Sequence, residues 1–222
     1  LLMGWVHNPS GVVKEASSEL VVKTWTPDTG LTTLYTSDVG SFPATPALGV
    51  DGDDVLLAAA AGENNNNGRN TRRIDVHRIA ADGTGGVDLR IAPADASEEA
   101  DVQLDVDRLE HPRLFSGSSG PVLSFVSYTL TDDGAQATVW RGEIGSEPVA
   151  LDTDILGHVT PTFGPDGALY WVRHTDDGPA LCTDSAADCT PLPGEAVRGI
   201  AAGSDGVWVS VMAADRQWTL VQ

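Results

Sequence analysis

Five histidines are the clearest candidates for acid–base or metal chemistry, because imidazole exchanges protons near neutral pH and binds transition metals. They are His7, His77, His111, His158 and His174. The last three could converge with aspartates, namely Asp152, Asp154 and Asp176. Such a group would suit a metal or an acid–base site, but sequence positions alone do not bring it together. We therefore predict no catalytic residue, no metal and no cofactor.

Several motifs that mark enzyme classes are missing from the chain. There is no GxSxG around a serine, no HExxH and no phosphate-binding loop. The segment Gly117–Gly120 has the composition of a turn rather than of a nucleophile elbow. The segment Asp51–Asp54 lacks the spaced ligands and the final glutamate of a calcium-binding loop. These absences favour a non-catalytic protein.

A strongly acidic segment covers residues 92–111 and is the longest connection that we expect. Six of its residues are predicted to bind a partner: Asp95, Glu98, Glu99, Asp101, Asp105 and Asp107. Long connections on a rigid scaffold often carry binding. The alternatives are a solvated insertion, a docking arm for a basic protein, and a weak cation site.

The overall charge narrows the classes of partner. The chain has 32 acidic and 13 basic residues, which gives a formal charge of −19. A surface this negative repels phosphate backbones and anionic membrane surfaces, so we predict no nucleic-acid partner. The longest apolar run, Val55–Ala61, is too short to span a bilayer. The charge suits either solubility or a basic partner.

The only two cysteines are Cys182 and Cys189, on either side of a short polar loop. Two reduced thiols are one interpretation. A local disulfide in an extracytoplasmic protein is the other, and it is the one we favour. A zinc site would need further ligands, which the surrounding sequence does not supply.

A phrase with a turn glycine, followed by an apolar strand, recurs along the chain, and three of its four copies contain proline. Its copies are Thr45–Gly52, Pro112–Gly120, Thr160–Val172 and Ile200–Val209. Their turn glycines are Gly52, Gly120, Gly167 and Gly206. A repeat length near ~40–50 residues is typical of propeller blades. The glycines supply the positive φ that tight hairpins require.

A second hairpin follows each of these copies, so each repeat predicts a four-stranded antiparallel sheet. The fold class is therefore all-β, a β-propeller with about five blades visible; a β-sandwich is the alternative. We expect one domain over residues 1–222. Its approximate blades are 1–40, 41–92, 108–152, 157–193 and 197–222, with the acidic insertion at 92–111. The six tryptophans are expected to fill the spaces between blades.

The clearest copy, Pro161–Val172, resembles the PD40-type, WD40-like repeat of TolB-like propellers. The resemblance lies in Pro161, Phe163, the run Pro165–Gly167 and Leu169, and it covers about a dozen residues of a blade. It implies a propeller fold and an extracytoplasmic setting in a bacterium or archaeon: periplasmic, cell-surface or secreted. It implies no activity, because the family shares no catalytic motif.

The order of strands predicts one interaction face. The long connections are all expected on the same face of the predicted propeller: Asn8–Ser18, Gly62–Thr71 and Ala92–His111. The first repeat lacks an inner strand and the last lacks an outer one, so we expect further sequence and a ring of six to eight blades. The predicted function is a non-catalytic scaffold that binds a protein through this face. The alternative is a propeller hydrolase or lyase with a site in the axial channel.

Overall fold

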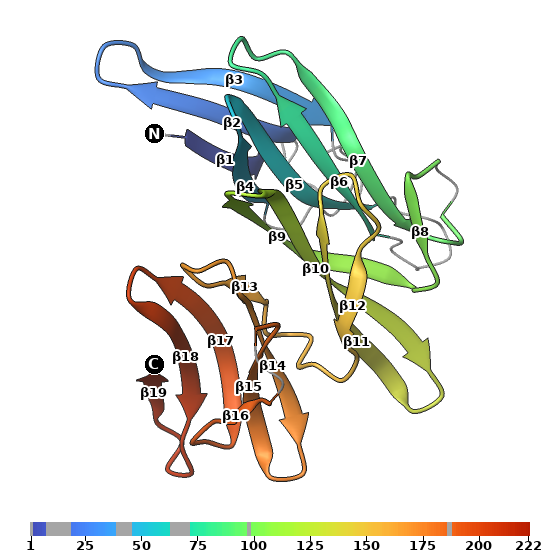
Figure 1. The fold of residues 1–222 in the computed structure, drawn as a ribbon, viewed down its shortest axis with the longest axis vertical. Coiled ribbons are helices and arrows are strands. Elements are labelled where there is room, and N and C mark those ends of the chain that lie inside the picture. Colours follow the sequence, from blue (N-terminus) through green and yellow to red (C-terminus); the bar gives the residue numbers. More distant parts are fainter. Residues whose placement is uncertain (1, 8–18, 39–45, 63–71, 97–98, 186–187) are drawn as a thin grey trace.

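The computed structural model describes residues 2–7, 19–38, 46–62, 72–96, 99–185 and 188–222. Within these ranges the chain forms strands and no helix, which confirms the all-β prediction for that part. No helix able to cross a membrane is therefore found among the described residues. The strands form five sheets of three to five strands each (Figure 1).

Each sheet is made from consecutive strands. The first sheet contains β1 (Leu2–His7), β2 (Glu19–Thr26) and β3 (Gly30–Asp38). The second contains β4 (Ala47–Asp51), β5 (Asp54–Gly62), β6 (Arg72–Ile79), β7 (Gly85–Pro93) and β8 (Val102–Leu104). The third contains β9 (Arg108–Gly117), β10 (Gly120–Thr131), β11 (Gly134–Glu143) and β12 (Val149–Asp152).

The last two sheets follow the same rule. The fourth contains β13 (Thr162–Phe163), β14 (Leu169–Thr175), β15 (Gly178–Thr183) and β16 (Thr190–Pro191). The fifth contains β17 (Ala196–Gly203), β18 (Gly206–Met212) and β19 (Trp218–Val221). The strands β1 and β19 belong to different sheets, so the described strands do not close a ring through a shared sheet.

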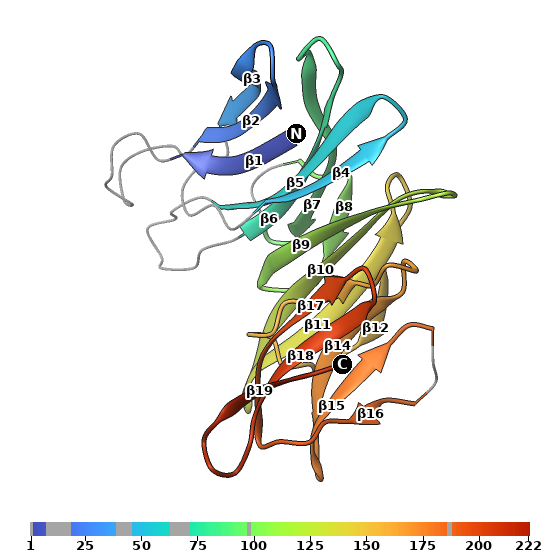
Figure 2. The same cartoon turned by 90° about the vertical axis from the view of Figure 1, so that its left-hand side faces the viewer.

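The predicted turn glycines shape the hairpins. Gly52 and Gly167 have φ of 61° and 81°, in the left-handed region that disfavours other residues. The antiparallel hairpins then bring the first strands of neighbouring sheets together. Contacts run from β4 to β9, from β9 to β13 and from β13 to β17. These first strands follow one another along the molecule (Figure 1), and the fourth and fifth sheets lie at the opposite end of its long axis from the first and second (Figures 1 and 2).

Hydrophobic clusters fill the spaces between successive sheets. Phe125 and Leu109 of the third sheet pack with Ile74 of the second. On the other side of the third sheet, Val126 packs with Trp171 of the fourth. Not every tryptophan has the predicted role. Trp25 and Trp218 are 44% and 45% exposed, because they lie in the short three-stranded sheets at the two ends.

The acidic insertion is more structured than its composition indicates. Within it, β8 pairs in parallel with β7 through residues Val102–Leu104. Leu104 is 8% exposed and belongs to the core that includes Phe125, and Val106 packs against the same core. The alternative of a merely solvated insertion is therefore wrong for residues 102–106. The alternating apolar residues of Val102–Val106 bury one side of a segment whose other side is acidic.

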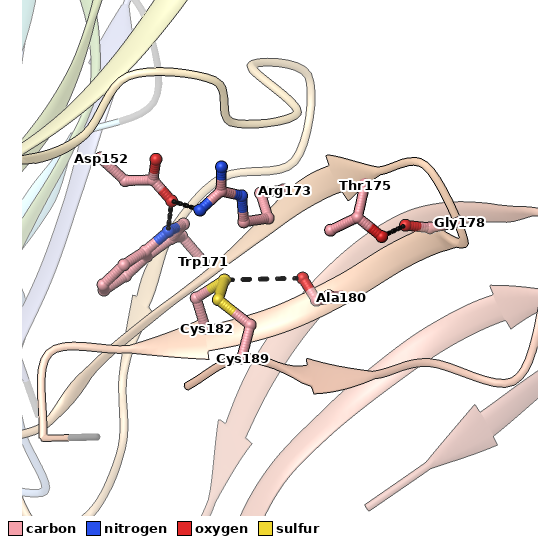
Figure 3. Close-up of a disulfide and its surroundings, with 8 residues drawn as sticks. All are labelled: Asp152, Trp171, Arg173, Thr175, Gly178, Ala180, Cys182 and Cys189. Atoms are coloured by element: carbon pink, nitrogen blue, oxygen red, sulfur yellow. Dashed lines mark hydrogen bonds and ion pairs between the residues drawn. A yellow bond between two sulfur atoms is a disulfide. The ribbon is translucent and has the colours of Figure 1, made fainter. Parts of the chain in front are cut away.

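The fourth sheet contains the disulfide that the sequence predicts. Cys182 on β15 is bonded to Cys189 directly before β16, with 4.3 Å between their Cα atoms (Figure 3). The hairpin register explains the pairing, because Leu181 lies opposite Thr190 and the cysteines are the next cross-strand pair. The bond therefore closes the loop at the turn end of this hairpin.

Replacing both cysteines, by Cys182→Ala and Cys189→Ala, is expected to lower the free energy of unfolding by about 2 kcal/mol, because the bond closes only a short loop. Urea denaturation measures this value, and reduction of the wild type should give a similar loss. A double variant as stable as the oxidised wild type would contradict the expectation.

A buried polar cluster lies between the first and second sheets. Asp75 on β6 is 2% exposed and accepts hydrogen bonds from Arg73 Nε at 3.0 Å and Arg90 Nε at 2.7 Å. Beside it, His77 is 1% exposed, and its Nδ1 lies 3.0 Å from the Tyr35 hydroxyl of β3. Alternation along β6 puts all of these groups on the side that faces the first sheet.

Burial lowers the pKa of His77 from its ordinary value of 6.5; Asp75 opposes this shift, and Arg90 and Arg73 add to it. Between the lowered pKa and 6.5 the unfolded chain binds more protons than the folded chain, so stability falls as the pH drops below about 6.5. Relative to His77→Asn, the wild type is expected to lose at most about 1.4 kcal/mol per pH unit in this window. Urea denaturation between pH 7.5 and 5 checks this, and parallel curves for the two proteins would contradict it.

Candidate functional site

Two acidic residues of the insertion form hydrogen bonds with the backbone of neighbouring strands. Asp101 accepts a hydrogen bond from the Arg90 backbone at 2.8 Å, and Asp107 accepts one from the Leu130 backbone at 2.6 Å. Asp95, Asp105 and Asp107 line an open pocket of about 340 Å³. Glu98 lies outside the described residues, as do residues 8–18 and 63–71. Partner binding by Asp95, Glu98, Glu99, Asp101, Asp105 and Asp107 stays a prediction.

The three histidines that we considered for a metal site have different environments in the structure. His174 is exposed near the end of β14, and His158 Nε2 lies 3.1 Å from the Val197 carbonyl of the fifth sheet. His111 lies instead beside Thr160. In the part of the chain that the structure describes, no three His, Cys, Asp or Glu residues form a metal-binding group.

The aspartates considered with them bind other groups. Asp152 accepts a hydrogen bond from Trp171 Nε1 at 2.8 Å and lies 3.6 Å from Arg173 (Figure 3). Asp154 accepts a hydrogen bond from Gln136, and Asp176 is exposed. Asp152 therefore joins the third sheet to the fourth and has a structural role. The possible convergence of three histidines with these aspartates, which we did not predict from the sequence, gives no metal-binding group among the described residues.

The candidate site that the structure does contain is built around a β-bulge at His111. Glu110 lies opposite Val126 and Arg113 lies opposite Ser124, so His111 and Pro112 together face a single residue of β10. Proline has no backbone N–H to donate to the ladder, which explains why the pairing breaks here. His111 has φ of 56°, in a region that few residues other than glycine adopt. Bulges of this kind turn a side chain away from its regular direction.

The bulge places the imidazole between a hydroxyl and a carboxylate. His111 Nδ1 lies 3.3 Å from Thr160 Oγ1, and His111 Nε2 lies 3.6 Å from Glu110 Oε2. The Glu110 side chain is 13% exposed and the His111 side chain 29% exposed. Arg108 Nε is 3.8 Å from the other oxygen of Glu110. A histidine held by a carboxylate, with part of its ring open to solvent, can act as a general acid or base.

The site lies where the first strands of the third and fourth sheets approach each other. His111 is near the start of β9, and Thr160 comes directly before β13. Both residues precede the proline of the repeated phrase, as Thr45 does in an earlier copy. The signal that could have singled out His111 is therefore its place in the repeat, where the other two copies have threonine.

No protein-family model and no curated protein matches the sequence. Solved structures match at low identity. A catalytically inactive virginiamycin B lyase from Staphylococcus aureus with quinupristin is 13% identical, over 99% of this chain and 88% of that one, with a TM-score of 0.39. A gluconolactonase from Xanthomonas campestris is 16% identical, over 98% and 75% of the two chains, with a TM-score of 0.43.

A thermostable family-43 glycoside hydrolase is 10% identical, over 98% of this chain and 86% of that one, with a TM-score of 0.46. These similar structures are β-propeller enzymes. These matches are lyases, a lactonase and hydrolases, whereas the sequence predicted a non-catalytic scaffold, and that prediction is not retained. Similarity at this level assigns no reaction and no residue to the present chain.

Proposed function

We propose that the chain is a β-propeller enzyme, a hydrolase or a lyase, whose acid–base pair is Glu110 and His111. The observation that carries the proposal is the bulge that holds His111 at positive φ between Thr160 and Glu110. Unfavourable backbone conformations are often retained at active sites, where the position of a side chain outweighs their cost in stability.

In this proposal the residues have separate tasks. His111 takes a proton from the substrate or from water and returns it to the leaving group. Glu110 holds the imidazole and stabilises its protonated form, while the Thr160 hydroxyl fixes the orientation of the ring. The formal charge of −19 favours uncharged or weakly charged substrates over polyphosphates.

We further propose that the five sheets are blades of one propeller domain of the PD40 or TolB-like kind, and that the protein works outside the cytoplasm. The repeated phrase and the contacts between the first strands support the blade assignment. The Cys182–Cys189 disulfide supports the extracytoplasmic assignment, because such bonds persist mainly in oxidising compartments.

The test is an activity screen of the purified protein against esters, lactones and glycosides, both uncharged and with one carboxylate. The wild type is compared with His111→Asn and with His174→Asn, which changes an exposed histidine away from the site. We expect turnover of at least one class by the wild type and by His174→Asn, and its loss in His111→Asn. Turnover that does not depend on His111 would contradict the assignment.

A further inference from the structure

Two arginines and a serine form a row across the third sheet, close to the proposed acid–base pair. Ser124 on β10 lies opposite Arg113 of β9 on one side and opposite Arg141 of β11 on the other. Ser124 lies between Val122 and Val126 along the strand, and these valines pack against Phe163 and Trp171 of the fourth sheet. Alternation along strands therefore puts the whole row on the side that faces the fourth sheet.

The two arginines of this row differ in their partners. Arg141 forms an ion pair with Asp184, a carboxylate of the fourth sheet. Arg113 has no carboxylate within ion-pair distance among the described residues, and its one hydrogen bond, at 3.3 Å, goes to the Pro112 carbonyl. The Arg113 side chain is nevertheless half-buried, and desolvation lowers its pKa. A guanidinium removed from water without a carboxylate is unfavourable unless a ligand supplies one.

Ser124 is a second, independent sign of an unfilled position. Its residue is fully buried, and its hydroxyl oxygen has no hydrogen-bond partner in the structure. Buried hydroxyls are nearly always paired, so an unpaired one next to an unpaired guanidinium indicates a place for an acceptor. Ser124 and Arg113 could both donate to the same group.

We propose that Arg113 and Ser124 bind a carboxylate of the substrate and so orient it against His111. This inference rests on the proposed function for its catalytic meaning. Arg113 and His111 are two residues apart on β9, so their Cα atoms are at most about 7 Å apart, which is within the length of a small molecule. A planar guanidinium matches a carboxylate with two parallel hydrogen bonds.

The charge of the site favours a carboxylate over a phosphate. One guanidinium neutralises a single negative charge, whereas a phosphate monoester carries about −1.5 to −2 near pH 7. The excess would lie beside Glu110 in a protein of formal charge −19. The substrate class is therefore a small molecule that carries one carboxylate.

Binding is measured by calorimetry with benzoate, acetate and gluconate as probes, at constant ionic strength. Benzamide is the uncharged control for benzoate, and inorganic phosphate tests the choice of anion. At least one monocarboxylate should bind the wild type, and Arg113→Gln should bind it about 10- to 100-fold more weakly, as expected for hydrogen bonds to charged groups. Arg198→Gln, which removes an exposed arginine of the fifth sheet, should bind it like the wild type.

Thermal unfolding of each variant shows whether weaker binding comes from the lost contact or from misfolding. Arg113→Met should have a higher unfolding midpoint than the wild type, because it removes an unpaired guanidinium from a half-buried position. The carboxylate probe should raise the midpoint of the wild type but not that of Arg113→Met. No binding of any monocarboxylate to the wild type, equal binding to Arg113→Gln, or preference for phosphate would overturn the proposal.

The experiments distinguish a failure of the proposed carboxylate site from a failure of the proposed acid–base pair. His111→Asn should keep carboxylate binding while it loses turnover. If Arg113→Gln weakens carboxylate binding but turnover does not depend on His111, the binding site stands and the acid–base assignment is wrong. If turnover depends on His111 but carboxylate binding is the same in Arg113→Gln, the enzyme stands and this substrate class is wrong.

Discussion

Asparagine in place of His111 is expected to lower kcat/KM by about 100- to 10,000-fold, the usual contribution of a positioned acid–base side chain. Asparagine removes the imidazole but adopts positive φ more readily than most residues, so it preserves the bulge. The free energy of unfolding should therefore change by less than about 1 kcal/mol. Steady-state kinetics on the substrate found by the screen and urea denaturation measure the two quantities.

A second variant separates the chemistry from the backbone. Valine is strongly disfavoured at positive φ, so His111→Val should lose activity and also about 1–2 kcal/mol of stability. Glu110→Gln should reduce kcat/KM and alter its pH profile, because an amide no longer stabilises the protonated imidazole. If His111→Asn and Glu110→Gln both keep the wild-type kcat/KM and pH profile, the acid–base pair is wrongly assigned.

The local part of the fold could be predicted because hairpins depend on neighbouring residues. Gly52 and Gly167 mark turns through their backbone conformation alone, and the disulfide joins cysteines only seven positions apart. The apolar strands that follow the turn glycines show the alternation or β-branching that strands require. Such signals need no knowledge of the rest of the chain.

The site itself depends on contacts between distant residues, which a single sequence does not display. His111 meets Thr160 across 49 positions, and the ion pair of Arg141 joins the third sheet to the fourth. The acidic insertion was misjudged for a related reason. Its aspartates dominate the composition, but Leu104 and Val106 decide where the segment packs. A buried minority of apolar residues can thus outweigh the charged majority around it.

That Arg113 lacks a carboxylate partner also could not be predicted from the sequence, because it depends on contacts between residues far apart in the chain. Nothing near either arginine in the sequence distinguishes Arg113 from Arg141. The difference arises because Asp184 of the fourth sheet reaches Arg141, while none of the described carboxylates reaches Arg113. Only the packing of two sheets therefore separates a structural arginine from one that can hold a ligand.

The largest expected effect on stability comes from Asp75, whose carboxylate is shared by Arg73 and Arg90 between the first two sheets. Asparagine has nearly the same shape but no charge, so Asp75→Asn leaves two guanidinium groups facing a neutral amide in a buried place. We expect a loss of about 3 kcal/mol in the free energy of unfolding, as for other buried pairs broken on one side. Urea denaturation at pH 7.5, where His77 is neutral, measures it without interference from that histidine.

The matched control lies on the same sheet. Asp88 binds Arg78 at 2.9 Å, but both side chains are about one-third exposed, and Arg78 also binds Asp51 and Asp54. Water screens this group, so Asp88→Asn should cost less than about 1 kcal/mol. The same substitution thus tests burial alone, because both aspartates pair with arginine. Equal losses in the two variants would show that burial does not make the ion pairs of Asp75 more important for stability than the exposed pair of Asp88.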